Sequence, residues 1–87
     1  SMEGKRLMIL YYAIIAYCLS GTCSNVESME RYIYEELLPY EQCLTTISTM
    51  IDEARKRNPE VKHKPISTLC VQKDFLKNKE RYTVWAR

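Results

Sequence analysis

The stretch that decides the expected fold is PISTLCVQKDFLKNKERYTVWAR, residues 65–87. Ile66, Leu69 and Cys70 recur at helical spacing, after a proline that suits a first helical turn. From Arg81 the pattern changes to alternation, in residue types that favour a pleated surface. Residues 77–80 are polar enough for a turn. We therefore expect a short helix, a short strand, a charged turn and an aromatic strand, which together form a C-terminal β-hairpin.

Three segments upstream of this stretch are expected to be helices. Residues 5–19 read as a buried helix with an apolar surface wide enough to meet a partner. Ser24 and Glu27 form a Ser-x-x-Glu capping box that predicts a helix over 25–38. Residues 40–57 carry apolar side chains at spacings of three and four, a helical pattern that ends at Asn58. The expected fold class is mainly α with a small C-terminal β-hairpin.

A chain of 87 residues has room for one domain with one core, and we expect that domain to span residues 1–87. Ser1, ahead of Met2, is expected to be the remnant of a tag.

The first residues of the chain could be a signal peptide instead of a buried helix. A basic beginning, an apolar run over 7–19 and small residues after it are typical of a secretory signal. The run is too short to span a bilayer as a helix, so we expect no membrane partner. We expect a buried helix and a nuclear or cytoplasmic protein. If residues 2–23 act as a signal peptide instead, the product is a secreted, helical, disulfide-bonded factor.

The cysteines carry little pattern. No CxxC pair occurs and the chain has one histidine, so we expect no zinc site. Four cysteines allow two disulfides, with three connectivities, in a secreted protein, or four reduced thiols inside a cell. We expect reduced thiols, because Cys18 and Cys70 lie in apolar helical patterns, where a free cysteine acts as a small hydrophobe. Cys23 and Cys43 are the other two.

Nothing in the sequence predicts an enzyme or a cofactor. There is no phosphate loop, nucleophile elbow or paired-carboxylate pattern. His63 lies in an expected connector, residues 58–64, and no nucleophile can be paired with it from the sequence. We expect a binding protein rather than a catalyst.

The net charge of +2 hides a strong asymmetry. Residues 1–53 hold three basic and eight acidic side chains, a net charge of −5. Residues 54–87 hold ten basic and three acidic side chains, a net charge of +7. Such a split favours a polyanionic partner for the second part of the chain, although basic side chains are also ordinary solvated surface.

The C-terminal pattern resembles the end of a winged-helix domain, as in forkhead proteins, linker-histone globular domains and the C-terminal domain of cullins. The residues that carry the resemblance are Ile66, Leu69, Phe75, Leu76, Arg81, Tyr82, Val84, Trp85 and Ala86. The resemblance covers residues 58–87 and is one of fold pattern. This chain departs from the pattern in its very short wing, its extra helix and the position of Pro65 in the helix that would read a groove.

This resemblance implies a DNA-binding module. The helix after Pro65 would enter the major groove of double-stranded DNA, and the hairpin would touch the adjacent backbone. Gln72 is the best candidate for base readout, because its amide can pair with adenine. The expected nucleic-acid-binding residues are Arg55, Lys56, Arg57, Lys62, Lys64, Ser67, Thr68, Gln72, Lys73, Lys77, Lys79 and Arg81.

The competing function is a protein–protein interaction module. Seven tyrosines, a tryptophan and the wide apolar first helix suit an interface. In that interpretation the apolar N-terminal helix binds a protein partner or another copy of the chain.

Overall fold

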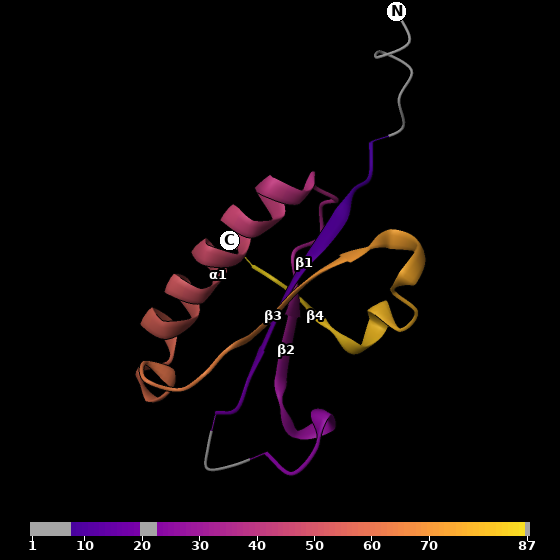
Figure 1. Cartoon of the computed structure of the whole chain (residues 1–87). Helices are drawn as coiled ribbons and strands as arrows, with labels where there is room; N and C mark the ends of the chain where they lie inside the picture. Colours follow the sequence, from indigo (N-terminus) through magenta and orange to yellow (C-terminus); the bar gives the residue numbers. More distant parts are fainter. Residues whose placement is uncertain (1–7, 20–22, 87) are drawn as a thin grey trace, which may run out of the picture.

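The computed structural model describes residues 8–19 and 23–86, which form a four-stranded sheet with a long helix against one face (Figure 1). The strands lie in the order β3-β1-β2-β4. β1 (Tyr11–Tyr17) is antiparallel to β2 (Glu30–Ile33) and to β3 (Ser67–Gln72). β4 (Thr83–Val84) runs parallel to β2. The sheet is therefore mixed, with β1 hydrogen-bonded on both sides.

β1 occupies the centre because its sequence, YYAIIAY, is apolar on both faces. Ala13, Ile15 and Tyr17 belong to the core beneath the helix, while Tyr12 and Ile14 belong to a second core on the opposite face. Aromatic and β-branched side chains pack well on a pleated surface. A strand buried on both faces reads as a continuous apolar run rather than an alternation.

The helix α1 (Tyr40–Arg57) has the bounds that the sequence predicted, so this prediction is confirmed. Its buried residues are Cys43, Ile47, Met50 and Ala54, which recur at spacings of three and four and pack on β1. Asn58 ends the helix, and its N–H donates to the carbonyl of Ala54 at 2.9 Å. Figure 1 shows α1 lying along one side of the sheet.

The other face of the sheet is covered by residues 73–82, which we call the 73–82 lobe (Figure 1). It holds two single turns of 3-10 helix, Lys73–Phe75 and Lys79–Arg81. Leu76 and Tyr82 of the lobe pack against the second core of Tyr12, Ile14 and Ile33. The lobe does not cover the outer edge of β3, the side that faces away from β1.

The two N-terminal helix predictions are wrong. Residues 11–17 form β1, and residues 5–7 of the expected helix over 5–19 lie outside the described part of the chain. The expected helix over 25–38 is a 3-10 turn, Val26–Ser28, followed by β2. The turn is closed by Asn25 and Ser28 rather than by a capping box, since the Ser28 N–H donates to Asn25 Oδ1 at 3.0 Å. Short polar side chains that bond their own backbone favour turns over helices.

The expected C-terminal helix and hairpin are also wrong. Residues 67–72 are the strand β3, in which Cys70 pairs with Ala13 and Leu69 pairs with Ile14. Residues 83–84 are extended, as predicted, but they pair in parallel with β2 rather than with a neighbouring strand of a hairpin. The mainly α, winged-helix-like architecture is therefore incorrect, because strands contributed by both halves of the chain build one sheet.

All four cysteines are paired, so the expectation of reduced thiols is wrong. Cys43 of α1 is bonded to Cys70 of β3, with their Cα atoms 6.2 Å apart. Cys18, which follows β1, is bonded to Cys23, with a Cα separation of 5.9 Å. Both separations are ordinary for disulfides. The first bond ties the helix directly to the edge strand of the sheet.

Candidate partner-binding edge of the sheet

The hydrogen bonds of β1 fix which way the backbone of its neighbours points. The Tyr34 N–H donates to the Ala13 carbonyl at 2.8 Å, and Tyr11 exchanges two bonds with Leu38. The odd-numbered residues of β1 therefore direct their backbone groups toward β2. Because successive residues of a strand point to opposite sides, Tyr12, Ile14 and Ala16 direct theirs toward β3.

It follows that β3 has one bonded side and one open side. Ser67, Leu69 and Val71 lie opposite Ala16, Ile14 and Tyr12, and bond to them. The N–H and C=O groups of Thr68, Cys70 and Gln72 consequently point away from the sheet. Among the described residues no strand pairs with this side of β3. Here the sheet presents a row of donors and acceptors that a further strand could bond.

The sequence of β3 does nothing to block such pairing. Natural edge strands are commonly protected by charged side chains, proline or a bulge. β3 is STLCVQ, six residues without charge or proline, and Ser67, Thr68 and Leu69 are exposed. β4, at the other edge, has only two residues. The outer side of β3 is therefore the longer and more open edge.

A groove lies next to this edge on the face away from α1, and we call it the β3 groove. Its volume is about 280 Å³. Leu69 stands at the groove with half of its surface exposed, and the guanidinium of Arg31 lies 6.0 Å from the centre of the Tyr82 ring. The lining residues are Ile14, Ala16, Arg31, Ser67, Thr68, Leu69 and Tyr82. The groove offers an apolar floor with one cation at its margin.

The disulfide between Cys43 and Cys70 holds this edge in place. Cys43 is fully buried under the sheet, so its bond fixes the middle of β3 to the rigid helix. An edge that is already ordered loses less conformational entropy when a partner strand binds. The site is thus preorganised by a covalent bond.

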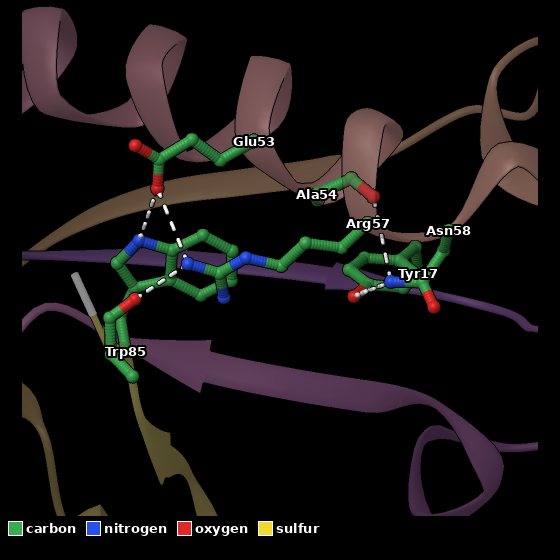
Figure 2. A network of polar contacts seen from close by, with 7 residues as sticks. Tyr17, Glu53, Ala54, Arg57, Asn58 and Trp85 are labelled. Atoms are coloured by element: carbon green, nitrogen blue, oxygen red, sulfur yellow. Dashed lines mark hydrogen bonds and ion pairs between the residues drawn. The ribbon is translucent and has the colours of Figure 1, made fainter.

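A polar network holds the C-terminal segment against α1 (Figure 2). The indole N–H of Trp85 donates to Glu53 Oε1 at 3.3 Å, and the Arg57 guanidinium lies 3.5 Å from the same oxygen. That guanidinium also lies 4.4 Å from the centre of the Trp85 ring and donates to the carbonyl of Ala86 at 2.7 Å. These contacts use the charges of Glu53 and Arg57 within the fold, so we assign the network a structural role.

The same side of the sheet holds a cluster of tyrosines. The Asn58 amide donates to the hydroxyl of Tyr17 at 3.2 Å, and the Tyr17 ring stacks on Tyr32 at 5.8 Å. The Tyr32 hydroxyl donates to Glu30 Oε1 at 3.2 Å. Burial, followed by the hydrogen bond with Tyr17, raises the pKa of Tyr32 well above its ordinary value of 10.0. Tyr32 therefore stays protonated and neutral throughout the physiological range.

A second hollow, of about 310 Å³, opens beside the Trp85 network. It is lined by Tyr34, Thr45, Thr46, Thr49, Met50, Glu53 and Trp85. Its one carboxylate, Glu53, is already bonded to Trp85 and Arg57.

Within the described ranges, no group of three or more His, Cys, Asp or Glu side chains is placed to hold a metal ion. His63 is exposed on the connector. No helix in the described part of the chain has the length and apolar character needed to cross a membrane.

The twelve residues expected to bind nucleic acid fall into three groups. Arg55, Lys56, Arg57, Lys62 and Lys64 lie at the end of α1 and in the connector after it. Lys73, Lys77, Lys79 and Arg81 lie in the 73–82 lobe, on the other face of the sheet (Figure 1). Ser67, Thr68 and Gln72 are in β3, between them.

Several of these cations make contacts inside the fold. The Arg55 guanidinium donates to the Lys64 carbonyl at 3.3 Å, and the Lys64 ammonium donates to the Leu19 carbonyl at 3.4 Å. The Arg81 guanidinium lies 3.7 Å from a carboxylate oxygen of Glu27. The structure thus spreads the expected DNA-binding residues over both faces of the sheet and uses part of their charge within the fold.

The sequence interpretation placed Thr68 and Gln72 in a site, but as residues of a helix. The sequence did not predict Ile14, Arg31 and Leu69 as residues of one groove. Each of the three belonged to a different expected helix, so nothing placed them side by side. An uncharged run with the β-favouring residues Thr68 and Val71 was the available signal for an edge strand. Comparison of the chain with protein-family models, curated proteins and solved structures found no match.

Proposed function

We propose that this chain is a protein-binding module of an oxidising compartment, and that it takes an extended segment of a partner along β3. The observation that carries the proposal is the outward-pointing backbone of Thr68, Cys70 and Gln72 on an uncharged edge strand whose first three residues are exposed. In strand addition the main chain supplies affinity, and pockets for alternate side chains supply specificity.

The β3 groove supplies the pocket. A partner strand paired with β3 places every second side chain on the face that carries Leu69. Such a side chain lies beside Leu69 at the mouth of a groove floored by Ile14 and Ala16. We therefore propose that the partner segment is β-prone and presents an apolar side chain there, with an acidic residue within reach of Arg31.

The two disulfides support the proposal that this protein belongs in an oxidising compartment. Disulfides persist in secreted proteins and in the lumen of secretory organelles, whereas thiols inside most cells are kept reduced. A thiol titration of the native protein under denaturing, non-reducing conditions tests this part. We expect no reactive thiols, and four reactive thiols would overturn it.

The binding proposal is tested with a displayed library of random seven-residue peptides. Thr68→Pro removes an N–H that points outward, so the bonds between β3 and β1 remain, whereas Thr68→Ala keeps the N–H and serves as the matched control. We expect selected β-prone peptides to bind wild type and T68A, and to lose about tenfold or more in affinity for T68P. They should also shift the NMR amide signals of residues 67–72. Peptides that bind T68P equally well, or shift signals elsewhere, would overturn the proposal.

A second candidate is binding to a polyanion such as DNA. It is supported by the exposure of Lys73, Lys77, Lys79 and Arg81 within the 73–82 lobe. Contacts of this kind bind phosphates without reading sequence. Readout by a helix in the major groove is not part of this candidate, because residues 67–72 form a strand.

Titration of a labelled DNA duplex at low and moderate salt tests the second candidate. We expect binding that weakens steeply with salt, and charge reversal at Lys77, Lys79 and Arg81 should weaken it without unfolding the domain. Charge reversal at Lys77 alone is compared with charge reversal at Lys62, which lies in the connector after α1, so that one charge is reversed inside the lobe and one outside it. Absence of binding at low salt would exclude this candidate.

A further inference from the structure

Two hollows adjoin beside α1, because Tyr34 and Trp85 line both of them. The first, of about 310 Å³, carries the carboxylate of Glu53, and the second, of about 250 Å³, carries those of Glu35 and Glu36. We propose that the two hollows form one binding site, which we call the Tyr34 site, for an alkyl guanidinium, the group that an arginine side chain carries. The Tyr34 site lies on the helix side of the sheet, so this inference is independent of the β3 edge.

The polar groups of the Tyr34 site are mainly acceptors. The Thr45 hydroxyl donates to the Glu41 carbonyl at 3.1 Å, and the Thr49 hydroxyl donates to the Thr45 carbonyl at 3.4 Å. A hydroxyl whose hydrogen is used in this way keeps its lone pairs, so it meets an occupant as an acceptor. The described residues that line the site include three glutamates and no lysine, arginine or histidine. A guanidinium carries N–H donors and no acceptor, so it complements this lining.

Glu53 is positioned to accept from a second cation. The Trp85 indole N–H and the Arg57 guanidinium both contact Oε1 of Glu53, at 3.3 and 3.5 Å. Figure 2 shows that the other carboxylate oxygen points away from both groups. A carboxylate has two acceptor oxygens, and charged donors form its strongest hydrogen bonds. Glu53 therefore offers an acceptor oxygen on a side chain that the Trp85 network already holds in place.

Arg57 shows how this part of the fold holds a guanidinium. Its guanidinium lies against the Glu53 carboxylate and 4.4 Å from the centre of the Trp85 ring, and it donates to the Ala86 carbonyl at 2.7 Å. The Tyr34 site offers the same kinds of group, an aromatic side chain, a carboxylate and further acceptors. A planar guanidinium stacks on aromatic rings and pairs with carboxylates as a fork, which an ammonium does not do. The lining therefore favours a guanidinium over an ammonium.

The charge around the Tyr34 site also favours a cation. Glu35 and Glu36 are exposed, and Glu53 is partly buried. Arg57 balances one of these three carboxylates, which leaves a net charge of −2 at the site among the described residues. A partly enclosed carboxylate attracts a cation more strongly than one in open water does, because the effective dielectric constant is lower.

An NMR titration of the full chain with Nα-acetyl-arginine methylamide, at constant ionic strength, tests the inference. This probe carries a guanidinium and no other charge. We expect a Kd of about 1 mM, with shifts of the Trp85 indole N–H signal and of the amides of residues 34–36 and 45–53. Nα-acetyl-citrulline methylamide, in which an uncharged urea group replaces the guanidinium, is the matched control and should not bind. Nα-acetyl-lysine methylamide should bind about threefold more weakly or worse.

Variants test which carboxylates hold the probe. E35Q/E36Q removes two exposed charges from the site without touching the Trp85 network, and should weaken binding by about threefold to tenfold. E41Q/E60Q removes two exposed charges outside the site, and should weaken binding by less than about twofold. E53Q keeps an acceptor for the Trp85 N–H but loses the charge, and should weaken binding by about tenfold. Thermal unfolding of each variant confirms that it is folded.

Three results would overturn the inference: equal binding of the arginine and citrulline probes, equal binding of the arginine and lysine probes, or wild-type affinity of E35Q/E36Q. Butylguanidine separates two sources of the group. Tighter binding of the arginine probe assigns the site to an arginine of a partner polypeptide, and equal or tighter binding of butylguanidine assigns it to a free guanidine. The T68P variant should bind the arginine probe as wild type does, so failure at the Tyr34 site and failure at the β3 edge are distinguishable.

Discussion

Ile14 of β1 and Leu69 of β3 lie opposite each other in the sheet, yet Ile14 is 4% exposed and Leu69 is 51% exposed. The 73–82 lobe covers the first side chain and stops short of the second. We expect Ile14→Ala to lower the free energy of unfolding by about 2–5 kcal/mol, because it leaves a cavity. Leu69→Ala should cost less than about 1 kcal/mol. Urea unfolding of the two variants measures this difference, and equal losses would contradict the arrangement.

The bond between Cys43 and Cys70 should stabilise the fold more than the bond between Cys18 and Cys23. The pairs are 27 and 5 residues apart in the sequence. Chain-entropy estimates give losses of about 3.5 and about 2 kcal/mol when each bond is removed. Paired Cys→Ala variants and chemical denaturation would show the order. The prediction fails if removing the bond between Cys18 and Cys23 lowers the free energy of unfolding as much as removing the bond between Cys43 and Cys70 does.

Arg57 should contribute to stability through Trp85 and Glu53. Arg57→Ala removes a cation–π contact and an ion pair, and we expect a loss of about 1 kcal/mol. Lys56→Ala, one residue earlier on an exposed position, is the control and should change little. Denaturant unfolding followed by Trp85 fluorescence measures both. If Lys56→Ala lowers the free energy of unfolding as much as Arg57→Ala does, the contacts of Arg57 with Trp85 and Glu53 do not stabilise the fold as predicted.

Tyr32 should make the protein less stable at high pH. Its pKa is raised in the folded state, so above about pH 10 the unfolded chain loses a proton that the folded chain keeps. The free energy of unfolding should therefore be independent of this group below pH 10 and fall as the pH rises further. Tyr32→Phe should remove that part of the fall, as measured by urea unfolding between pH 9 and pH 11. A Tyr32→Phe variant whose stability falls as much as that of the wild type over this range would contradict the prediction.

Hydrogen exchange should alternate along β3. The amides of Leu69 and Val71 bond to β1, whereas those of Thr68, Cys70 and Gln72 point outward. At low protein concentration we expect slow exchange for the first two and fast exchange for the other three, measured by NMR. Uniform protection of all five at low concentration would contradict the assignment of an open edge.

The sequence predicted α1 to the residue and missed every strand except the extended end near residue 83. The helix was predictable because one face is buried and the other is wet, which leaves a 3.6-residue period. β1 was not, because both of its faces are buried and an apolar run has no period to read. Its Tyr and Ile content was the remaining signal for a strand.

β3 was misread for a different reason. Ile66 and Cys70 face the helix, while Leu69 faces the other way. Three apolar residues on two faces of a strand happened to match helical spacing. Residues 67–72 form a strand because Cys70 pairs with Ala13 and is bonded to Cys43. Both partners are far from Cys70 in the chain, so no local sequence pattern predicts them. The same distance hid the disulfide, and with it the candidate edge.

The enclosure of β1 has a consequence for handling the protein. From Leu7 to Leu19 the chain carries thirteen residues without charge or proline, a composition prone to stack into fibrils when it is exposed. In the native sheet the strand within this run is flanked by β2 and β3 and covered on both faces. Heating or reduction at high concentration should therefore end in precipitation rather than in a reversible transition.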